Sequence, residues 1–413
     1  MLDAVRAGAT LQGARDGALA NLIERDRRLA YELAAGVLRR RAQLDRMLEL
    51  GSADPRLHDV LRLGAYQLRA LARVPPYAAV STSVELAREL AGERAAGYVN
   101  RMLRQLSRDA GCGMRDAGET HPRWLIERWR RRFGHAETER LVTWNDSRPG
   151  LILQPARWDT ETLRRQLKAL GIGVQEAPLG AGLEVVAGAN ASRIPHPAQL
   201  PGFAEGGFIV QDPAHALVCR FAAIPPGAIV YDACAAPGGK AVTLERRGAR
   251  VIAGDARPER VGRLVETGRR AGVAIRVAVA DLLAAPFRPQ SLAAVLVDAP
   301  CTATGTMARH PDARWRLTPR SIARAAERQR ALVAAAAALV RPGGLLVYAT
   351  CSLEPEENSD IVTEFLARHP AFARAPATGA VPAALLTPAG DFQSLPQRHG
   401  MDGAYAARLA RVR

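Results

Sequence analysis

The chain has 413 residues, 48% of them hydrophobic and 24% charged, which is the balance of a soluble globular protein with two or three domains. The longest apolar run, ALVAAAAALV at 331–340, is too short to cross a bilayer, and the first residues lack the apolar core of a secretory signal. Five cysteines without C-x-x-C spacing predict neither a disulfide framework nor a zinc site. We therefore expect a cytoplasmic protein without membrane contact or bound metal.

The charge is strongly positive. Lysine and arginine number 57 against 41 acidic residues, a formal net charge of +16, which favours a polyanion as partner. Arginine supplies nearly all of the excess, because Lys168 and Lys240 are the only lysines. Guanidinium groups clamp phosphates and stack on bases, so an RNA partner is a natural reading.

The first segment, residues 1–140, is predicted to be all-helical. RDRRLAYELAAGVLRRRAQLDRMLEL and DVLRLGAYQLRAL repeat apolar residues at helical spacing, and Pro75-Pro76 interrupts the pattern. STSVELAREL then shows a helix-capping signal, and YVNRMLRQLSR is a further amphipathic stretch. The segment is either an RNA-binding domain or a packing scaffold.

The second segment, residues 141–225, is predicted to be a small mixed α+β region. LILQP and GLEVVAG are typical of strands, and TETLRRQLKAL of a helix. GIG at 171–173 and GAG at 180–182 lack the third glycine and the preceding strand of a dinucleotide-binding loop, so we interpret both as turns. The spacing of these residues indicates no task for this segment.

The third segment, residues 226–413, alternates strands with helices. Such βα repeats predict an α/β, Rossmann-like, doubly wound parallel sheet, whose ligands bind at the carboxyl ends of its strands. The strands are AIVYDAC, RVIAGDA, IRVAVAD, LAAVLVDAP and GGLLVYATC. Polar or reactive residues stand at all five ends: Asp232, Asp255, Asp281, Asp298 and Cys351. Each aspartate alone is also compatible with a helix cap, and a lone cysteine with simple packing.

The glycine-rich loop DACAAPGGK predicts the cofactor. It departs from the nicotinamide fingerprint G-x-G-x-x-G, and Gly238-Gly239 allows a ligand close to the backbone. Asp255 is placed to accept hydrogen bonds from ribose hydroxyls and Asp281 to meet the exocyclic amine of adenine. Acids without a phosphate cradle suit a sulfonium compound, which favours S-adenosylmethionine over NAD.

Three motifs carry a family resemblance. DACAAPGGK, DAPCTATG and YATCSLEPEEN, in this order, resemble the RNA cytosine-C5 methyltransferase family, and the helical front resembles the NusB family, whose domain binds RNA. Over nearly its whole length the chain is similar to methyltransferases of small-subunit ribosomal RNA. Three departures occur: Thr302-Ala303 replaces the usual Ser-Gly, Ala241 a common threonine, and Ala404 an aromatic residue.

The resemblance implies a reaction and roles for individual residues. The reaction is methylation of C5 of a cytosine in 16S ribosomal RNA through a covalent cysteine–C6 adduct. Cys351 matches the nucleophile and Cys301 the second cysteine, while Asp298 is expected to stabilise the adduct. The cofactor-contacting positions are Cys234, Ala235, Ala236, Pro237, Gly238, Gly239, Lys240, Asp255, Asp281 and Asp298. Cys234 is expected to be structural, and Cys112 and Cys219 ordinary residues.

Other functions compete with this reading. A DNA cytosine methyltransferase would use Pro300-Cys301 as its nucleophilic pair, which the cysteine at 351 and the helical front argue against. Two alternatives stay open: a cytosine-C5 methyltransferase that acts on another RNA such as tRNA, and a non-catalytic, RNA-binding ribosome assembly factor. We expect a monomer whose partner is small-subunit ribosomal RNA rather than DNA.

Overall fold

The computed structural model describes most of the chain. The described residues are 1–50, 54–108, 120–186, 194–377 and 379–412. Cys112 lies outside them, so the interpretation of that residue is not tested. Among the helices described, none is both long enough and apolar enough to cross a membrane.

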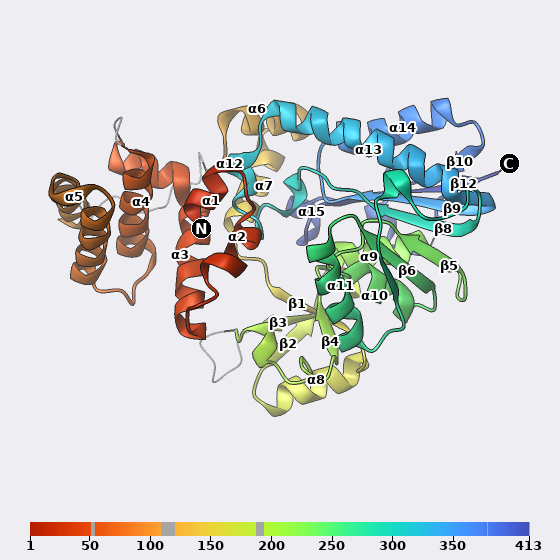
Figure 1. Ribbon diagram of the computed structural model, residues 1–413, viewed down its shortest axis with the longest axis horizontal. Helices are drawn as coiled ribbons and strands as arrows, with labels where there is room; N and C mark the ends of the chain where they lie inside the picture. The colour runs from red at the N-terminus through yellow and green to blue at the C-terminus, as the bar shows by residue number, and fades with distance from the viewer. Residues whose placement is uncertain (51–53, 109–119, 187–193, 378, 413) are drawn as a thin grey trace. The chain divides into compact units, whose positions relative to one another are not determined.

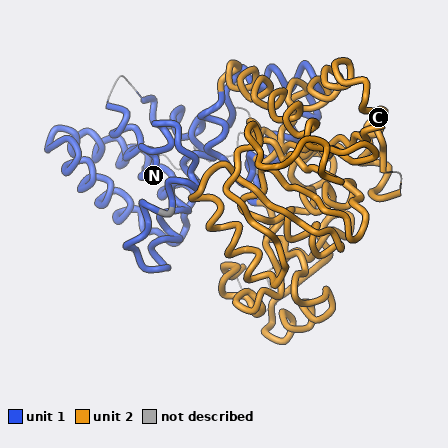
Figure 2. Tube along the Cα trace, turned by 45° about the vertical axis from the view of Figure 1, so that its right-hand side comes forward, with its two compact units in different colours: residues 1–148, 307–317 blue, residues 149–306, 318–413 orange. Residues whose placement is uncertain are grey.

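The chain packs into two compact units (Figure 2). Unit 1 consists of residues 1–148 and 307–317, and unit 2 of residues 149–306 and 318–413. The division into domains at 140 and 225 stays a prediction. The compact units add a feature that the sequence did not reveal: the short stretch 307–317 belongs to unit 1, although its neighbours on both sides belong to unit 2.

Unit 1 is built of helices, as the apolar spacing predicts (Figure 1). They are α1 (Leu2–Arg6), α2 (Leu11–Ala18), α3 (Glu24–Leu48), α4 (Pro55–Ala70), α5 (Pro76–Arg108), α6 (Arg123–Phe133), α7 (His135–Asp146) and α12 (Ala313–Arg316). Leu44, Leu61 and Leu103 are fully buried in a core shared by α3, α4 and α5. Helix α5 begins at Pro76, earlier than the capping signal at Ser81 indicated, because proline fits the first helical turn. It bends at Gly92, whose φ is +79°.

Unit 2 begins with a small antiparallel sheet of order β2-β3-β1-β4. Its elements are β1 (Leu151–Pro155), α8 (Thr160–Ala169), β2 (Gly173–Glu176), β3 (Leu183–Val186) and β4 (Phe208–Val210). The strands in LILQP and GLEVVAG and the helix between them are confirmed, whereas β2 was not predicted. Leu153, Leu163 and Phe208 are fully buried in the core of this part.

The larger sheet of unit 2 confirms the Rossmann-like prediction. Its order is β10-β12-β9-β8-β5-β6-β7, with β11 beside β12. Its strands are β5 (Ile229–Asp232), β6 (Arg250–Asp255), β7 (Arg276–Val279), β8 (Leu292–Asp298), β9 (Val340–Thr350), β10 (Phe372–Arg374), β11 (Phe392–Ser394) and β12 (Ala404–Arg411). Strands β5 to β9 pair in parallel, at the positions that the five motifs predicted.

Helices cover both faces of this sheet (Figure 1). α9 (Pro213–Ala222), α10 (Gly239–Arg246) and α11 (Pro258–Ala271) lie on one face, and α13 (Pro319–Leu339) and α14 (Ser359–Arg368) on the other. Strand β8 shows why two layers form: Leu296 packs in the core of the first face and Val297 in that of the second. A strand buried on both faces reads as a continuous apolar run, as LAAVLV does.

The chain ends in strands that the sequence pattern did not reveal. β12 pairs antiparallel with β9, matching Tyr405 with Thr350 and Ala410 with Leu345. Its sequence, AYAARLAR, is rich in alanine, which strands disfavour, so its pairing with β9, β10 and β11 makes it a strand. This pairing places β9 inside the sheet and fixes the strand whose end carries Cys351.

Candidate active site

The strand-end residues form a row along one edge of the large sheet. Asp232, Asp255 and Asp298 are the last residues of β5, β6 and β8, and Cys351 directly follows β9. Because the strands lie in the order β9-β8-β5-β6-β7 and are parallel, their carboxyl ends meet at the same edge. Cys351 and Asp298 therefore come from neighbouring strands.

The loop after β5 is shaped to bring its backbone close to a ligand. Gly238 has a φ of +109°, which favours glycine, and a Cβ there would lie 2.9 Å from Leu264 Cδ1. Arg260 Nη2 donates a 2.6 Å hydrogen bond to the Ala236 carbonyl oxygen, and Ala235 N donates one of 2.9 Å to Gly254 O. The loop is thereby held against β6 and α11.

Asp255 meets the requirement for a ribose-binding acid. Its side chain is buried, and Oδ1 accepts a 3.1 Å hydrogen bond from Arg257 N. Oδ2 forms an ion pair with Arg260 Nη1 at 3.2 Å, but it has no hydrogen-bond partner in the described part of the chain. Buried polar atoms are normally bonded, so this oxygen fits a ligand hydroxyl as donor.

Asp281 occupies a different environment. It is exposed, and its Oδ1 accepts a 3.0 Å hydrogen bond from Leu283 N at the start of η4 (Leu282–Ala284). The helix-capping alternative thus describes one contact of this residue. Its expected contact with adenine stays a prediction.

A charged pair lies beside the glycine loop. Lys240 Nζ donates a 2.7 Å hydrogen bond to Asp298 Oδ2, and His215 Nδ1 of α9 lies 2.9 Å from the same nitrogen. Burial lowers the pKa of Lys240, but the charge of Asp298 and the hydrogen bond to it outweigh burial and raise this pKa above its ordinary value. Lys240 is therefore a cation that orients Asp298.

The two cysteines of the motifs lie in contact. Cys301 Sγ and Cys351 Sγ are 3.2 Å apart, and both side chains are half-buried. The hydrogen bond to Cys351 and then burial raise the pKa of Cys301 well above its ordinary value. Cys301 therefore keeps its proton at neutral pH, and either sulfur can donate the hydrogen bond between them.

A buried carboxylate joins the two cysteine-bearing loops. Glu357, in η6 (Pro355–Glu357), is fully buried and accepts hydrogen bonds from Thr302 N at 2.9 Å, Thr302 Oγ1 and Ser352 Oγ. Gln329 Nε2 of α13 donates 3.0 Å hydrogen bonds both to Glu357 Oε1 and to the carbonyl oxygen of Pro300. Glu357 thus binds the residue after Cys301 and the residue after Cys351, which fixes the separation of the two sulfurs.

The departures from the family pattern have visible surroundings. Thr302 contributes two of the bonds to Glu357, so threonine serves at this position. Ala303 has a φ of +56°, in the left-handed region where the usual glycine would be unstrained. Ala241 is buried in α10, and Ala404 N in β12 donates a 2.9 Å hydrogen bond to Ser394 Oγ.

The remaining described cysteines differ from the pair. Burial, followed by the charge of Asp232, raises the pKa of Cys234 to about 12. Burial also raises the pKa of Cys219 to about 12. Neither thiol is in the ionised form that nucleophilic chemistry needs, which agrees with their interpretation as unreactive residues.

Sequence reasoning missed three residues of the site. Glu357 lies in PEEN, at the end of the third motif, whereas His215 lies in QDPAHALV, within the segment for which the spacing indicates no task. Arg260 gave no signal, because only the fold brings α11 to the glycine loop. Glu357 lies seven residues after the end of β9, in a polar stretch that is typical of an exposed turn, so its burial could not be foreseen.

Comparisons with known proteins agree with this geometry. Family models match residues 223–410 as 16S rRNA methyltransferase RsmB/F, residues 3–108 as the NusB family, and residues 121–189 as a ferredoxin-like domain of RsmF/B-like methyltransferases. In structure, the chain is similar to PH0851, with a TM-score of 0.79 and 24% identity over 99% of this chain and 97% of that one. It is also similar to NSun6 from Pyrococcus horikoshii, solved with SFG, with a TM-score of 0.61 and 20% identity over 71% and 98% of the two chains.

The sheet, the glycine loop and the strand-end acids define a Rossmann-like, S-adenosylmethionine-dependent methyltransferase. The chain is 35% identical to the probable ribosomal RNA small subunit methyltransferase B of Synechocystis, over 94% of this chain and 92% of that protein. It is 33% identical to ribosomal RNA small subunit methyltransferase B of Vibrio cholerae, over 98% and 94%. The chain belongs to the ribosomal RNA small subunit methyltransferase B family.

Proposed function

We propose that this protein methylates C5 of a cytosine in 16S ribosomal RNA, with Cys351 as the nucleophile. The observation that carries the proposal is the contact of Cys351 with Cys301, whose sulfur atoms are 3.2 Å apart. Cys351 follows β9, and the neighbouring strand β8 ends in Asp298, which is hydrogen-bonded to Lys240. The names of its relatives, ribosomal RNA small subunit methyltransferase B, support the choice of RNA.

The site has the features that S-adenosylmethionine requires. Asp255 offers a buried carboxylate oxygen without a hydrogen-bond partner among the described residues, and Gly238 leaves the backbone accessible. The residues that would hold the cofactor are Cys234, Ala235, Ala236, Pro237, Gly238, Gly239, Lys240, Asp255, Asp281 and Asp298. When bound, the cofactor supplies an electrophilic methyl group.

The cysteines carry the covalent chemistry. Cytosine C5 is a poor nucleophile, but addition of the Cys351 thiolate to C6 moves the electron pair of the C5=C6 bond to C5, which then takes the methyl group. The C5 proton next transfers to a base, its electron pair restores the double bond, and the sulfur of Cys351 leaves as a thiolate. Cys301, 3.2 Å from that sulfur, assists this release.

Asp298 orients the base. Its carboxylate accepts the hydrogen bond of Lys240, and in the proposed complex it stabilises the cytosine as charge develops during the addition. The target base has to leave its stack, which costs a few kcal/mol and least in a single-stranded loop.

Unit 1 is proposed to hold the RNA. Its NusB-family region, 3–108, and the arginine-rich sequence RWLIERWRRRF of α6 support this role. We further propose that the protein acts as a monomer in the cytoplasm. The net charge of +16 suits an RNA partner in that compartment.

Transfer of a labelled methyl group tests the proposal. Purified protein is incubated with labelled S-adenosylmethionine and 16S ribosomal RNA, a tRNA mixture or double-stranded DNA, and the products are digested to nucleosides. The proposal expects 5-methylcytosine in 16S ribosomal RNA alone. Labelled tRNA or DNA would support the competing substrates, and no transfer to any of them would favour a non-catalytic assembly factor.

A further inference from the structure

The stretch 307–317 is part of unit 1 but is bounded by active-site elements of unit 2 (Figure 2). Before it, η5 (Thr304–Thr306) is joined to the Cys351 region, because Gly305 N donates a 3.0 Å hydrogen bond to Cys351 O. Five residues separate Cys301 from Met307. After it, Thr318 begins the helix α13 that carries Gln329.

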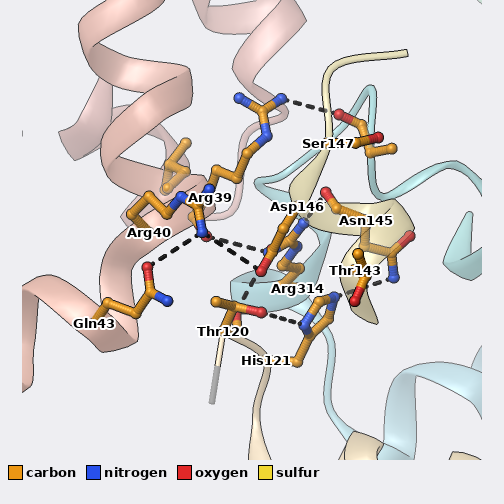
Figure 3. Close-up of polar contacts among 12 residues, drawn as sticks. Arg39, Arg40, Gln43, Thr120, His121, Thr143, Asn145, Asp146, Ser147 and Arg314 are labelled. Atoms are coloured by element: carbon orange, nitrogen blue, oxygen red, sulfur yellow. Dashed lines mark hydrogen bonds and ion pairs between the residues drawn. The ribbon is translucent and has the colours of Figure 1, made fainter. Parts of the chain in front are cut away.

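Arg314 fastens this stretch inside unit 1. Its side chain has 0% exposure, and Nη1 donates a 2.7 Å hydrogen bond to Asp146 Oδ1 at the end of α7 (Figure 3). The same nitrogen lies 3.2 Å from Arg39 O and 3.4 Å from Thr120 O, and Nη2 donates to Asn145 O. Burying an arginine side chain costs much free energy unless hydrogen-bond acceptors surround its charge. The oxygen atoms around Arg314 are such acceptors, so this environment suits a guanidinium group.

The pKa of Arg314 reflects the burial of its guanidinium group. Burial lowers the pKa of Arg314 to about 10, and the charge of Asp146 acts in the opposite direction. Arg40 Nη1 lies 3.7 Å from the other oxygen of Asp146. Arg314 is therefore a specific anchor, and its hydrogen-bond partners lie on α3, on α7 and before α6.

Neighbours of Arg314 add separate attachments. Trp315 Nε1 donates a 2.6 Å hydrogen bond to Leu38 O, and Arg39 Nη2 donates one of 2.9 Å to Ala308 O. Asp312 Oδ2 accepts a 3.2 Å hydrogen bond from Leu11 N. Both ends of the stretch are thus bonded to helices of unit 1.

We propose that Arg314 is a positioning residue for Cys301, an inference that rests on the proposed function. Through Arg314, unit 1 holds the segment that follows Cys301 in the sequence, so release of the methylated base depends on the helical unit. Cys351 follows β9, which lies between β8 and β12, so the sheet holds it in addition to the hydrogen bond from Gly305. Loosening Arg314 therefore impairs release and spares the initial attack.

The kinetics of the covalent complex test this inference. In Arg314→Met we expect the adduct with 16S ribosomal RNA to form at the wild-type rate but to decay about tenfold more slowly, since a displacement of about 1 Å can cost up to a hundredfold in rate. Arg314→Lys should recover part of the decay rate, because it keeps the charge without the fork. Asp146→Asn serves as a milder second variant should Arg314→Met not fold. Decay at the wild-type rate in the folded variants would overturn the proposal.

Leu61→Ala is the matched control, because it removes a fully buried side chain from the core of unit 1 but leaves the contacts of Arg314 in place. Equal slowing in Leu61→Ala would also overturn the proposal, since general loosening of unit 1 would then explain the effect. If wild-type protein forms neither adduct nor 5-methylcytosine, the proposed function fails instead. Alkylation of the free protein with iodoacetamide decides the positioning role without RNA: Cys301 should react several-fold faster in Arg314→Met, and an unchanged rate would contradict it.

Discussion

Lys240 donates a 2.7 Å hydrogen bond to Asp298, which joins the last residue of the glycine-rich loop DACAAPGGK to the end of β8, the sheet neighbour of β5. The carboxylate of Asp298 in turn acts on Asp232, the buried end of β5. Burial, and then the charge of Asp298, raises the pKa of Asp232 to about 7. The row of strand ends therefore holds more negative charge than one lysine neutralises.

Asp232→Asn should make the protein more stable at high pH. The folded pKa of Asp232, about 7, exceeds the ordinary value, so the folded state binds the extra proton and loses stability as the pH rises from about 4 through 7. The variant should gain at least about 1 kcal/mol in free energy of unfolding at pH 8 relative to pH 5. Urea unfolding at both pH values measures this, with exposed Asp360→Asn as control. A gain that is equal at both pH values would contradict the assignment.

Asp255→Ala should weaken cofactor binding. We expect a loss of about 1.5–3 kcal/mol in binding free energy for S-adenosylmethionine, the scale of a hydrogen bond to a charged group. Arg260, its ion-pair partner, is 42% exposed and keeps its hydrogen bond to the Ala236 carbonyl oxygen, so it tolerates the change. Isothermal titration calorimetry measures the affinity, and an unchanged value in the folded variant would remove Asp255 from the cofactor site.

Glu357→Gln should destabilise both cysteine-bearing loops. The amide nitrogen of glutamine would face the donors Thr302, Ser352 and Gln329, leaving at least one buried donor unpaired at a cost of about 1–3 kcal/mol. The free energy of unfolding, measured with denaturant, and the rate of methyl transfer should both fall. Glu364→Gln, a half-buried change on α14 that removes the ion pairs with Arg330 and Arg368, is the comparison. If the two variants behave alike, the carboxylate does not organise the site.

Ala303→Gly should stabilise the protein. The φ of +56° strains alanine by about 1 kcal/mol, and glycine relieves that strain. Ala299→Gly, also in the DAPCTATG motif but not among the positive-φ residues, should destabilise it instead. Thermal unfolding of the two variants gives opposite signs on this account; a loss of stability in Ala303→Gly would show that the loop does not adopt this conformation.

The sequence predicted the parallel strands, from the repeated βα units, and the residues of the candidate site that lie in its three motifs. The five parallel strands and their polar ends follow from the βα alternation, because parallel strands place their carboxyl ends at one edge. β12 could not be foreseen, since its alanines become a strand through pairing with β9, β10 and β11. Arg314 and Glu357 were hidden for a similar reason: both are charged residues whose burial depends on partners far away in the chain.

The central claim is that Cys351 attacks and Cys301 assists release, and trapping on denaturing gels with labelled 16S ribosomal RNA tests it most directly. Cys351→Ala should form no covalent complex, because no adduct can start. Cys301→Ala should also lose turnover but accumulate protein joined to RNA, because the adduct forms and does not resolve. A trapped complex in Cys351→Ala and none in Cys301→Ala would reverse the roles, and full activity in both variants would contradict the covalent account altogether.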